Sequence, residues 1–324
     1  MKIAIVGAGA IGGYFGGVLA RSGAEVSLLA RGPHLQAIQA RGLRVQTADG
    51  EDFTVHPKAS DDPAALGRQD VLIISVKAPA LPALAPQLAP MLGPDTAIVT
   101  AMNGIPYWYF HAYAGPVAGR HLKTVDPDGA IWRALPPERV IGGVVRLPSS
   151  VPEPGVIRGL TRANLALGEP DGTQSPRLAS ISQALMAAGI NAPMRSDIRH
   201  DIWVKLLGNM AFSPCSVLTG GTQAQVAADP AMRAVLTALM REGQSVGEGL
   251  GIRFEVSVEQ RVTEGGGVAL HKPSMLQDWE AGRPMEIESI IGAVAELAAM
   301  QGIATPTIAI VLALLRRKAA LQQA

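Results

Sequence analysis

A glycine-rich turn between a short apolar segment and a helix-like run most constrains the fold of this chain. The apolar segment covers residues 2–6, a second one covers residues 25–30, and the turn between them reads Gly7-Ala8-Gly9-Ala10-Ile11-Gly12. In a β-α-β unit the first glycine turns the chain out of the strand, the second lets the backbone approach a pyrophosphate, and the third lets the helix pack on the sheet. The pyrophosphate then meets the unpaired N–H groups at the helix N-terminus. The pattern predicts a Rossmann-type dinucleotide-binding domain.

Two other interpretations of this stretch compete with that one. Lys2 followed by apolar residues resembles a secretory signal, although six glycines between Gly7 and Gly17 are poor material for a signal helix. A glycine-rich turn can also occur in a sheet protein that binds no cofactor. Neither alternative accounts for the complete strand–helix–strand order.

The residue after the second strand indicates which dinucleotide is bound. NAD-binding domains place an acidic residue there, whereas an arginine accommodates a 2′-phosphate. Here Ala30 is followed by Arg31, and no acidic residue lies between Arg31 and Asp49. A guanidinium group offers a planar fork of donors to phosphate. We therefore expect NADP(H) rather than NAD(H), with a solvated loop charge as the alternative for Arg31.

Composition limits the class of protein and its partners. A chain of 324 residues suggests two domains, and 48% hydrophobic residues against 17% charged ones supply large cores and a subunit interface. The formal net charge of +1, without a basic stripe, argues against nucleic acid as a partner. Cys215 is the single cysteine, as expected in a reducing cytoplasm. The apolar run 308–315 is too short to span a membrane.

Hydrophobic patterns divide the chain near Arg195 into an α/β part and a helical part. We expect a doubly wound domain over residues 1–195 and an all-α domain over residues 196–324. Beyond the first β-α-β unit, strands are expected at residues 43–47, 53–56, 70–76, 96–101, 140–146, 155–158, 164–168 and 190–194. We expect the strands at 140–146, 155–158 and 164–168 to complete the main sheet, with antiparallel edge strands. Helices are expected at residues 34–41, 81–92, 178–188, 198–213, 230–250, 256–264, 274–281, 285–300 and 307–321.

Polar side chains follow two of the expected parallel strands. Lys77 comes directly after the buried run 70–76, and Asn103-Gly104 follows the strand at 96–101. Ligands of such sheets gather at the carboxyl ends of strands, so both residues can meet the cofactor or the substrate. A surface lysine and an ordinary Asn-Gly turn are the alternatives.

The segment 105–139 is unusually rich in aromatic residues. Five rings fall between Tyr107 and Tyr113, and Trp132 follows, in a chain that is only 4% aromatic. These rings can form one wall of a substrate pocket. Alternatively, they pack the insertion onto the domain or onto a partner subunit, and we favour this second interpretation.

The first helix of the second part carries a row of polar residues. Lys205, Asn209 and Ser213 are spaced i, i+4, i+8 and share one helix face beside an apolar stripe. Such a row suits the wall of a cleft between domains. The alternative is a lysine that extends its amine to solvent and an asparagine near a helix end, and from spacing alone we favour this alternative.

Across essentially its whole length the chain resembles the ketopantoate reductase (2-dehydropantoate 2-reductase) family, which reduces an α-keto acid with NADPH. The glycine motif, Arg31, Lys77 and Asn103-Gly104 match. The more specific matches are Trp203-x-Lys205-Leu-x-x-Asn209 and Ser274-Met-Leu-Gln-Asp278 followed by Glu286. The resemblance implies a Rossmann domain followed by an all-α domain, as in the 6-phosphogluconate-dehydrogenase-like proteins.

The resemblance also implies a role for each matching residue. Lys205 is then the proton donor, Asn209 and Ser274 hold the substrate, and Glu286 lies beside the cofactor and the active centre. The residues expected to contact NADPH are Gly7, Ala8, Gly9, Ala10, Ile11, Gly12, Arg31, Lys77, Asn103 and Glu286. Lys205 and Ser213 are further candidates for contact with the substrate.

Two departures from the family pattern concern the substrate. Ser213 stands where the family often has a second asparagine, which reaches further, and the aromatic insertion is longer than the minimal pattern. We expect reduction of 2-dehydropantoate to pantoate, without a metal ion. The alternatives are a bulkier 2-keto acid or a dinucleotide-binding sensor without chemistry. A cytoplasmic homodimer is expected from the apolar helical part.

Overall fold

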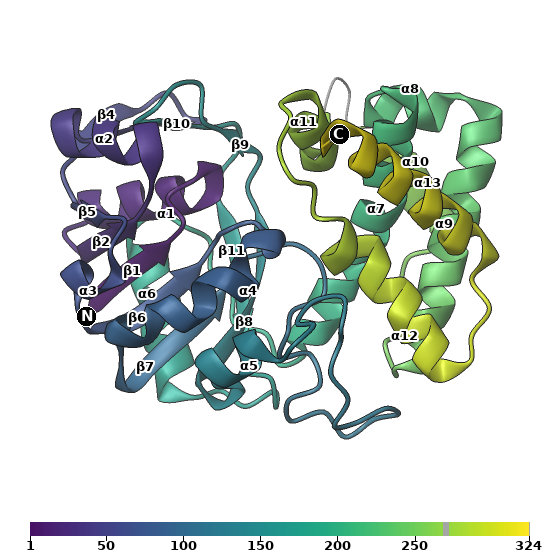
Figure 1. The fold of residues 1–324 in the computed structure, drawn as a ribbon, viewed down its shortest axis with the longest axis horizontal. Helices are drawn as coiled ribbons and strands as arrows, with labels where there is room; N and C mark the ends of the chain where they lie inside the picture. The colour runs from purple at the N-terminus through teal and green to yellow at the C-terminus, as the bar shows by residue number, and fades with distance from the viewer. Residues whose placement is uncertain (268–271, 324) are drawn as a thin grey trace. The chain divides into compact units, whose positions relative to one another are not determined.

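The computed structural model describes residues 1–267 and 272–323, which form two compact units (Figure 1). Unit 1 comprises residues 1–102 and 129–198. Unit 2 comprises residues 103–128 together with the described residues from Arg199 onward. The division into domains at residues 195 and 196 stays a prediction. The compact units separate after Ile198, and they place the aromatic loop 103–128 with the helices.

Unit 1 is built on a seven-stranded sheet of the described residues, in the order β11-β8-β7-β6-β1-β2-β5. All neighbouring strands are parallel except the edge pair β8 and β11, which is antiparallel. The strands are β1 (Lys2–Val6), β2 (Glu25–Leu29), β5 (Lys58–Ser60), β6 (Gln69–Ile74), β7 (Leu92–Thr100), β8 (Val140–Arg146) and β11 (Asn164–Gly168). This sheet confirms the predicted α/β class with an antiparallel edge.

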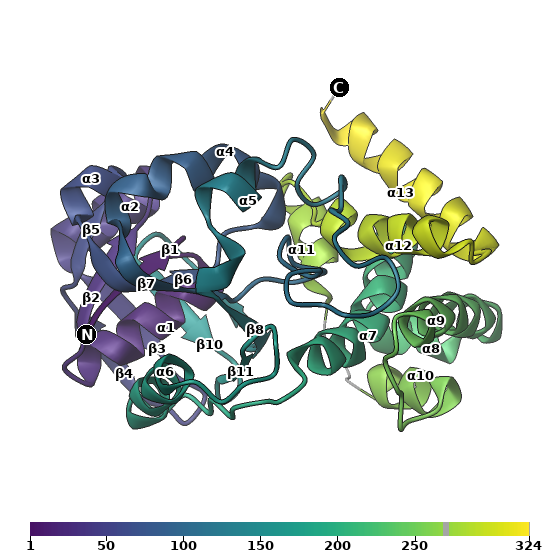
Figure 2. The ribbon, with the colours of Figure 1, turned by 90° about the horizontal axis from the view of Figure 1, so that it is seen from below.

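Helices cover both faces of the sheet. Figure 2 shows α1 (Ala10–Arg21) and α6 (Pro176–Ala187) on one side and α4 (Leu81–Leu84) and α5 (Ala130–Ala134) on the other. Other short helices of unit 1 include α2 (Gly32–Arg41), α3 (Pro63–Leu66) and η3 (Pro137–Arg139). Burial of the sheet on both faces explains the almost continuous apolar run of β6.

A second, four-stranded sheet lies against α1, in the order β4-β3-β10-β9. Its strands are β3 (Leu43–Gln46), β4 (Asp52–Val55), β9 (Ser149–Ser150) and β10 (Val156–Gly159). The expectation that residues 155–158 complete the main sheet is therefore wrong. Glycines on α1 make the contact possible, because a Cβ at Gly13 would lie 2.7 Å from Ile157 Cδ1 and one at Gly17 would lie 2.3 Å from Val45 Cγ2.

Two further expectations for unit 1 are wrong in detail. The helix expected at 81–92 is a short α-turn followed by a 3-10 segment, η2 (Ala85–Met91), after η1 (Ala78–Ala80), because Pro86 and Pro90 interrupt α-helical hydrogen bonding. Residues 190–194 form isolated bridges to β11 instead of a strand. Pro193 there has no N–H to extend the ladder.

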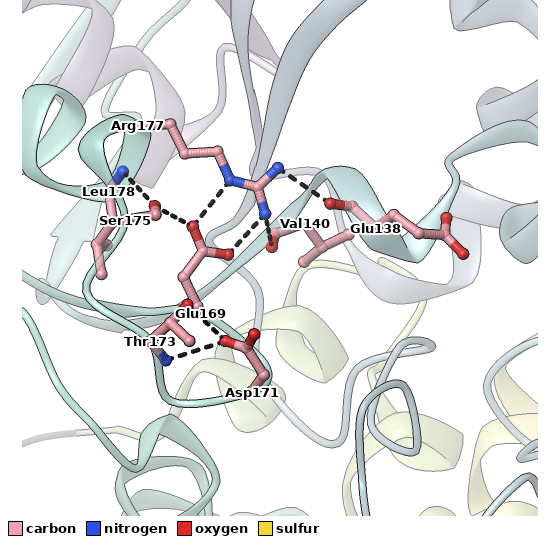
Figure 3. Close-up of polar contacts among 8 residues, drawn as sticks. All are labelled: Glu138, Val140, Glu169, Asp171, Thr173, Ser175, Arg177 and Leu178. Carbon is pink, nitrogen blue, oxygen red and sulfur yellow. Dashed lines mark hydrogen bonds and ion pairs between the residues drawn. The ribbon is translucent and has the colours of Figure 1, made fainter.

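An ion pair with a buried carboxylate joins the end of β11 to the start of α6 (Figure 3). The Glu169 carboxylate, 3% exposed, accepts hydrogen bonds from Arg177 Nε at 2.8 Å and Nη2 at 2.6 Å, and from the Ser175 hydroxyl. Arg177 also donates to the carbonyls of Glu138 and Val140. The pair therefore ties β8, β11 and α6 together.

Unit 2 is made of helices and the loop 103–128 (Figure 1). Its helices are α7 (Ile198–Thr219), α8 (Gln223–Ala228), α9 (Pro230–Gly249), α10 (Val258–Gly266), α11 (Ser274–Glu280), the π-helical turn η4 (Glu288–Gly292), α12 (Ala293–Gln301) and α13 (Pro306–Gln323). The first residue of α7 belongs to unit 1. Helix α7 continues past Pro214, where we expected it to end, because Cys215 and Val217 are almost fully buried. Within the described residues, no helix is both long and apolar enough to cross a membrane.

Candidate active site

The glycine turn of unit 1 has the geometry that its sequence predicts. Gly7 has a φ of +98°, and a Cβ there would lie 2.6 Å from Val76 Cγ1. At Gly12 a Cβ would lie 2.2 Å from the Gly7 carbonyl oxygen and from Ser75 Oγ, so only glycine lets α1 pack this closely. Gly9 is the N-cap of α1 and has no heavy atom within 4 Å of its Cβ position, which leaves its backbone open to a ligand.

The N-terminus of α1 suits an anion. Its N-cap, Gly9, provides no side-chain hydrogen bond, and its first turn contains no acidic residue. The unpaired N–H groups and the positive end of the helix dipole are therefore not neutralised by the helix itself. The residues at this helix N-terminus therefore fit the pyrophosphate of a dinucleotide.

Arg31 and Lys77 lie on either side of this turn. Strand β1 pairs in parallel with β2 and with β6, so the carboxyl ends of the three strands share one edge of the sheet. Arg31 follows β2, Lys77 follows β6, and both side chains are exposed. This edge therefore presents one cation on each side of the helix N-terminus.

Ser75 belongs to this turn, and the sequence analysis missed it. Its hydroxyl donates to the Gly7 carbonyl at 2.9 Å and lies 3.3 Å from the Val6 carbonyl, while its N–H donates to Val6. The hydroxyl thus holds the first glycine against β6. A small hydroxyl residue at the carboxyl end of the run 70–76 was the available signal.

A hydrogen-bonded row of three residues lies in unit 2. Lys205 Nζ donates to Asn103 Oδ1 at 2.7 Å, and Asn103 Nδ2 donates to Glu286 Oε2 at 3.1 Å. Glu286 is buried at 4% exposure, whereas Lys205 and Asn103 are half-buried. The Asn103 amide thus bridges the Lys205 ammonium group and the Glu286 carboxylate. The three residues lie far apart in the sequence.

Helix α7 sets the direction of Lys205. Trp203, Leu206 and Leu207 are 0%, 2% and 0% exposed and fix the buried side of the helix. Lys205 is left half-buried, and Asn209 lies one turn further along the same face. The helix therefore presents the ammonium group beside the core without burying it completely.

The other residues expected to bind substrate also belong to unit 2. Asn209 is half-buried and Ser213 is 5% exposed, both on α7. Ser274 is the first residue of α11 and is exposed. Their contact with a substrate stays a prediction.

The aromatic rings of the loop 103–128 pack inside unit 2. Tyr107, Trp108, Tyr109 and Phe110 are all at most 6% exposed. The Tyr109 hydroxyl accepts from Trp203 Nε1 at 2.7 Å, and Arg199 donates to the carbonyls of Tyr109 and His111. This burial confirms the packing interpretation, and these four rings do not form an open pocket wall.

Family models match both parts of the chain. The ketopantoate reductase PanE/ApbA model matches residues 3–172, and the model of the C-terminal part of the same family matches residues 197–319. The chain belongs to the ketopantoate reductase family.

Individual members of the ketopantoate reductase family are similar over their full length. A 2-dehydropantoate 2-reductase of Mesorhizobium japonicum is 48% identical over 320 residues, 98% of each chain. A crystal structure from Ralstonia solanacearum MolK2, provisionally assigned as a ketopantoate reductase, is 44% identical with a TM-score of 0.94 and covers 99% of this chain and 98% of its own. The 2-dehydropantoate 2-reductase of Geobacter metallireducens GS-15 is 28% identical, has a TM-score of 0.86 and covers 98% of this chain and 99% of its own.

Proposed function

We propose that this chain catalyses the NADPH-dependent reduction of 2-dehydropantoate to pantoate. The observation that carries the proposal is the row Lys205–Asn103–Glu286 in a member of the ketopantoate reductase family. The full-length similarity to the Mesorhizobium japonicum 2-dehydropantoate 2-reductase supports the substrate.

Lys205 acts as the proton donor in this proposal. NADPH, when bound, supplies a hydride to the keto carbon, so negative charge develops on the keto oxygen. The lysine ammonium, which is the ordinary form at neutral pH, stabilises that oxygen and transfers a proton to it. The product is the alcohol, and the neutral amine regains a proton from solvent.

Asn103 and Glu286 orient the donor. Asn103 Oδ1 accepts one of the three ammonium protons, and the buried Glu286 carboxylate holds the amide from its other side. An ammonium group has three donors, so it can serve more than one acceptor at a time. Asn209, Ser213 and Ser274 bind the polar groups of the keto acid.

Arg31 selects NADPH over NADH. It follows β2 at the edge where a 2′-phosphate is recognised in Rossmann domains, and its exposed guanidinium matches phosphate geometry. Lys77 contacts the cofactor from the β6 side of the same edge. The glycine turn and α1 hold the pyrophosphate.

A second candidate is the reduction of a different 2-keto acid. Ser213 is shorter than the asparagine common in the family and leaves more room beside Asn209. A panel of 2-keto acids of increasing size, followed by NADPH absorbance, separates the two candidates. The highest kcat/KM for 2-dehydropantoate supports the first one, and an absence of turnover with every keto acid favours a dinucleotide sensor.

Lys205→Ala tests the role of the ammonium group. Because general acid catalysis contributes about 10²–10⁴-fold, kcat should fall by that order while the Kd of NADPH changes little. Lys318→Ala, on α13, is the matched lysine control and should keep the wild-type kcat. Equal losses in kcat and NADPH affinity would contradict the assignment.

Location and assembly complete the proposal. A single cysteine that is buried and unpaired is compatible with the reducing cytoplasm. Exposed apolar side chains on α13 favour a homodimer, since such patches commonly mark subunit contacts.

A further inference from the structure

The helical segment that directly follows Glu286 contains a π-helical turn. We expected a continuous α-helix over residues 285–300, but Glu288–Gly292 adopt π geometry before α12 begins at Ala293. A π-turn inserts a residue into the helix, is costly, and is frequently found at functional sites. Here it begins two residues after the carboxylate of the candidate active site.

The loop that follows Asn103 docks on this π-turn. Ile105 N–H donates to the Ser289 carbonyl at 2.8 Å, so that carbonyl accepts a hydrogen bond from outside the helix. Gly104 approaches the same peptide so closely that a Cβ would lie 2.1 Å from the Ser289 carbonyl oxygen and 2.6 Å from its carbon. Gly104 also has a φ of +86°, which disfavours any other residue.

This docking joins the two backbone segments that carry Asn103 and Glu286. Asn103 precedes Gly104, and Glu286 precedes Ser289 by three residues, so the backbone contact lies next to the side-chain hydrogen bond at 3.1 Å. The amide oxygen of Asn103 is then directed at Lys205 Nζ. Moving the loop away from the π-turn would move that acceptor away from the ammonium group.

The π-turn itself is held by side chains. Glu288 accepts from Arg316 Nε at 2.8 Å and Nη2 at 2.6 Å, which fastens the turn to α13. Gly292 makes room for this carboxylate, since a Cβ there would lie 2.4 Å from Glu288 Oε2. The pair is about half exposed, at 50% and 44%, so its contribution to overall stability is small.

We propose that Gly104 and the π-turn at Ser289 form a positioning junction that sets the Asn103 amide between Lys205 and Glu286. Gly104, Ser289 and Glu288 touch neither substrate nor cofactor in this inference, and they act through Asn103. The inference deepens the proposed function and rests on it for its kinetic consequences.

Gly104→Ala is the direct test, with Gly251→Ala as its matched control. Gly251 lies in the same unit with a φ of +84°, but its Cβ position has open space. Both variants place an alanine at a similar positive φ, and only Gly104→Ala collides with Ser289. Because small misplacements of catalytic groups cost up to about 100-fold, we expect kcat of Gly104→Ala to fall at least about tenfold below that of Gly251→Ala.

The pH profile separates positioning from a general loss of structure. When Lys205 loses its acceptor on Asn103, its protonated form is less favoured relative to the neutral amine. The alkaline limb of the kcat profile should therefore move to lower pH in Gly104→Ala only. A second readout needs no turnover: the ¹⁵N-edited NMR signals of the Asn103 side-chain amide, assigned with Asn103→Ser, should shift in Gly104→Ala and stay in place in Gly251→Ala.

Glu288→Gln covers the case in which Gly104→Ala does not fold. Loosening a half-exposed ion pair should lower kcat by about two- to fivefold, with the same direction of the pH shift and an almost unchanged Tm. Glu259→Gln, in the exposed pair with Arg241, is its control and should leave kcat and the pH profile unchanged.

The outcomes distinguish this inference from the proposed function. Wild-type protein that does not reduce 2-dehydropantoate contradicts the function, and the amide signals still test the junction. If the Asn103 signals stay in place in both Gly104→Ala and Glu288→Gln, or if kcat and pH profile match those of the controls, the junction does not position Asn103.

Discussion

Arg31 and Lys205 are both cations, but their surroundings suit them to different tasks. Arg31 is exposed after β2, where its planar fork can meet a phosphate. Lys205 is half-buried and already hydrogen-bonded to an amide whose other end meets a carboxylate. The same charge therefore serves binding in one unit and proton transfer in the other, according to our proposal.

Arg31→Ala should separate the two dinucleotides. Because a hydrogen bond to a charged group contributes about 1.5–3 kcal/mol, the KM for NADPH should rise about tenfold or more. The KM for NADH should stay unchanged, since NADH has no 2′-phosphate. Steady-state kinetics with each cofactor measures this, and an equal rise for both would remove Arg31 from the phosphate site.

Cys215 should be chemically inert in the folded protein. Burial raises the pKa of its thiol to about 12, and only the thiolate reacts with disulfide reagents. At pH 8, well below that pKa, native protein should not react with dithionitrobenzoate, and reaction should begin only as the pH approaches the raised value. Guanidinium chloride should release the full signal of the single cysteine at pH 8. A rapid reaction of native protein at that pH would contradict the burial.

At the scale of elements, burial of the carboxylate decides how much an ion pair contributes to stability. The pair Glu169–Arg177 and the pair Asp52–Arg44 both bond through two guanidinium nitrogens, and the shorter contact is 2.6 Å in each. The carboxylate side chain is 4% exposed in the first and 39% exposed in the second. The first pair joins strands and a helix around a buried carboxylate (Figure 3), whereas both side chains of the second pair are exposed.

Arg177→Met should destabilise unit 1 strongly. Removing one partner leaves the buried Glu169 carboxylate without its counter-charge, which costs about 3 kcal/mol or more. Arg44→Met is the control, and because its pair is exposed it should cost less than about 1 kcal/mol. Urea unfolding of both variants followed by circular dichroism measures the difference, and equal losses would show that burial is not the deciding factor.

At the scale of the whole molecule, the proposed homodimer would cover apolar residues of α13. Ile310, Leu314 and Leu321 are 63%, 53% and 59% exposed and share one helix face. We expect light scattering after gel filtration to give twice the chain mass of 33.7 kDa. Ile310→Glu should shift that mass toward the single chain, because a charge in an apolar contact is costly. A wild-type mass of one chain would overturn the proposed homodimer.

The local patterns of the chain predicted much of the fold. The glycine turn was predictable because Gly7 and Gly12 satisfy steric demands of their nearest neighbours. Helix α9 matches the expected range 230–250 almost to the residue, since Asp229 caps its start and its apolar spacing is regular. The residues of the candidate site were named from a family pattern, and their roles stay predictions.

Three features were not predictable from local patterns. The small sheet joins β3 to β10, more than a hundred residues apart, and short strands carry no signal that selects their partner. The loop 103–128 follows strand β7 in sequence, but Arg199 and Trp203 hold it in unit 2. The π-turn at 288–292 has the composition of an ordinary helix.

The order of residues alone was sufficient for the β-α-β unit, the helical second half and the identity of the polar groups, because turns, periodicity and charge act between near neighbours. Only the folded chain showed that an amide from residue 103 bridges Lys205 and Glu286. Such a bridge depends on backbone contacts between distant segments, and a steric fit like that of Gly104 on Ser289 exists only once both segments are in place.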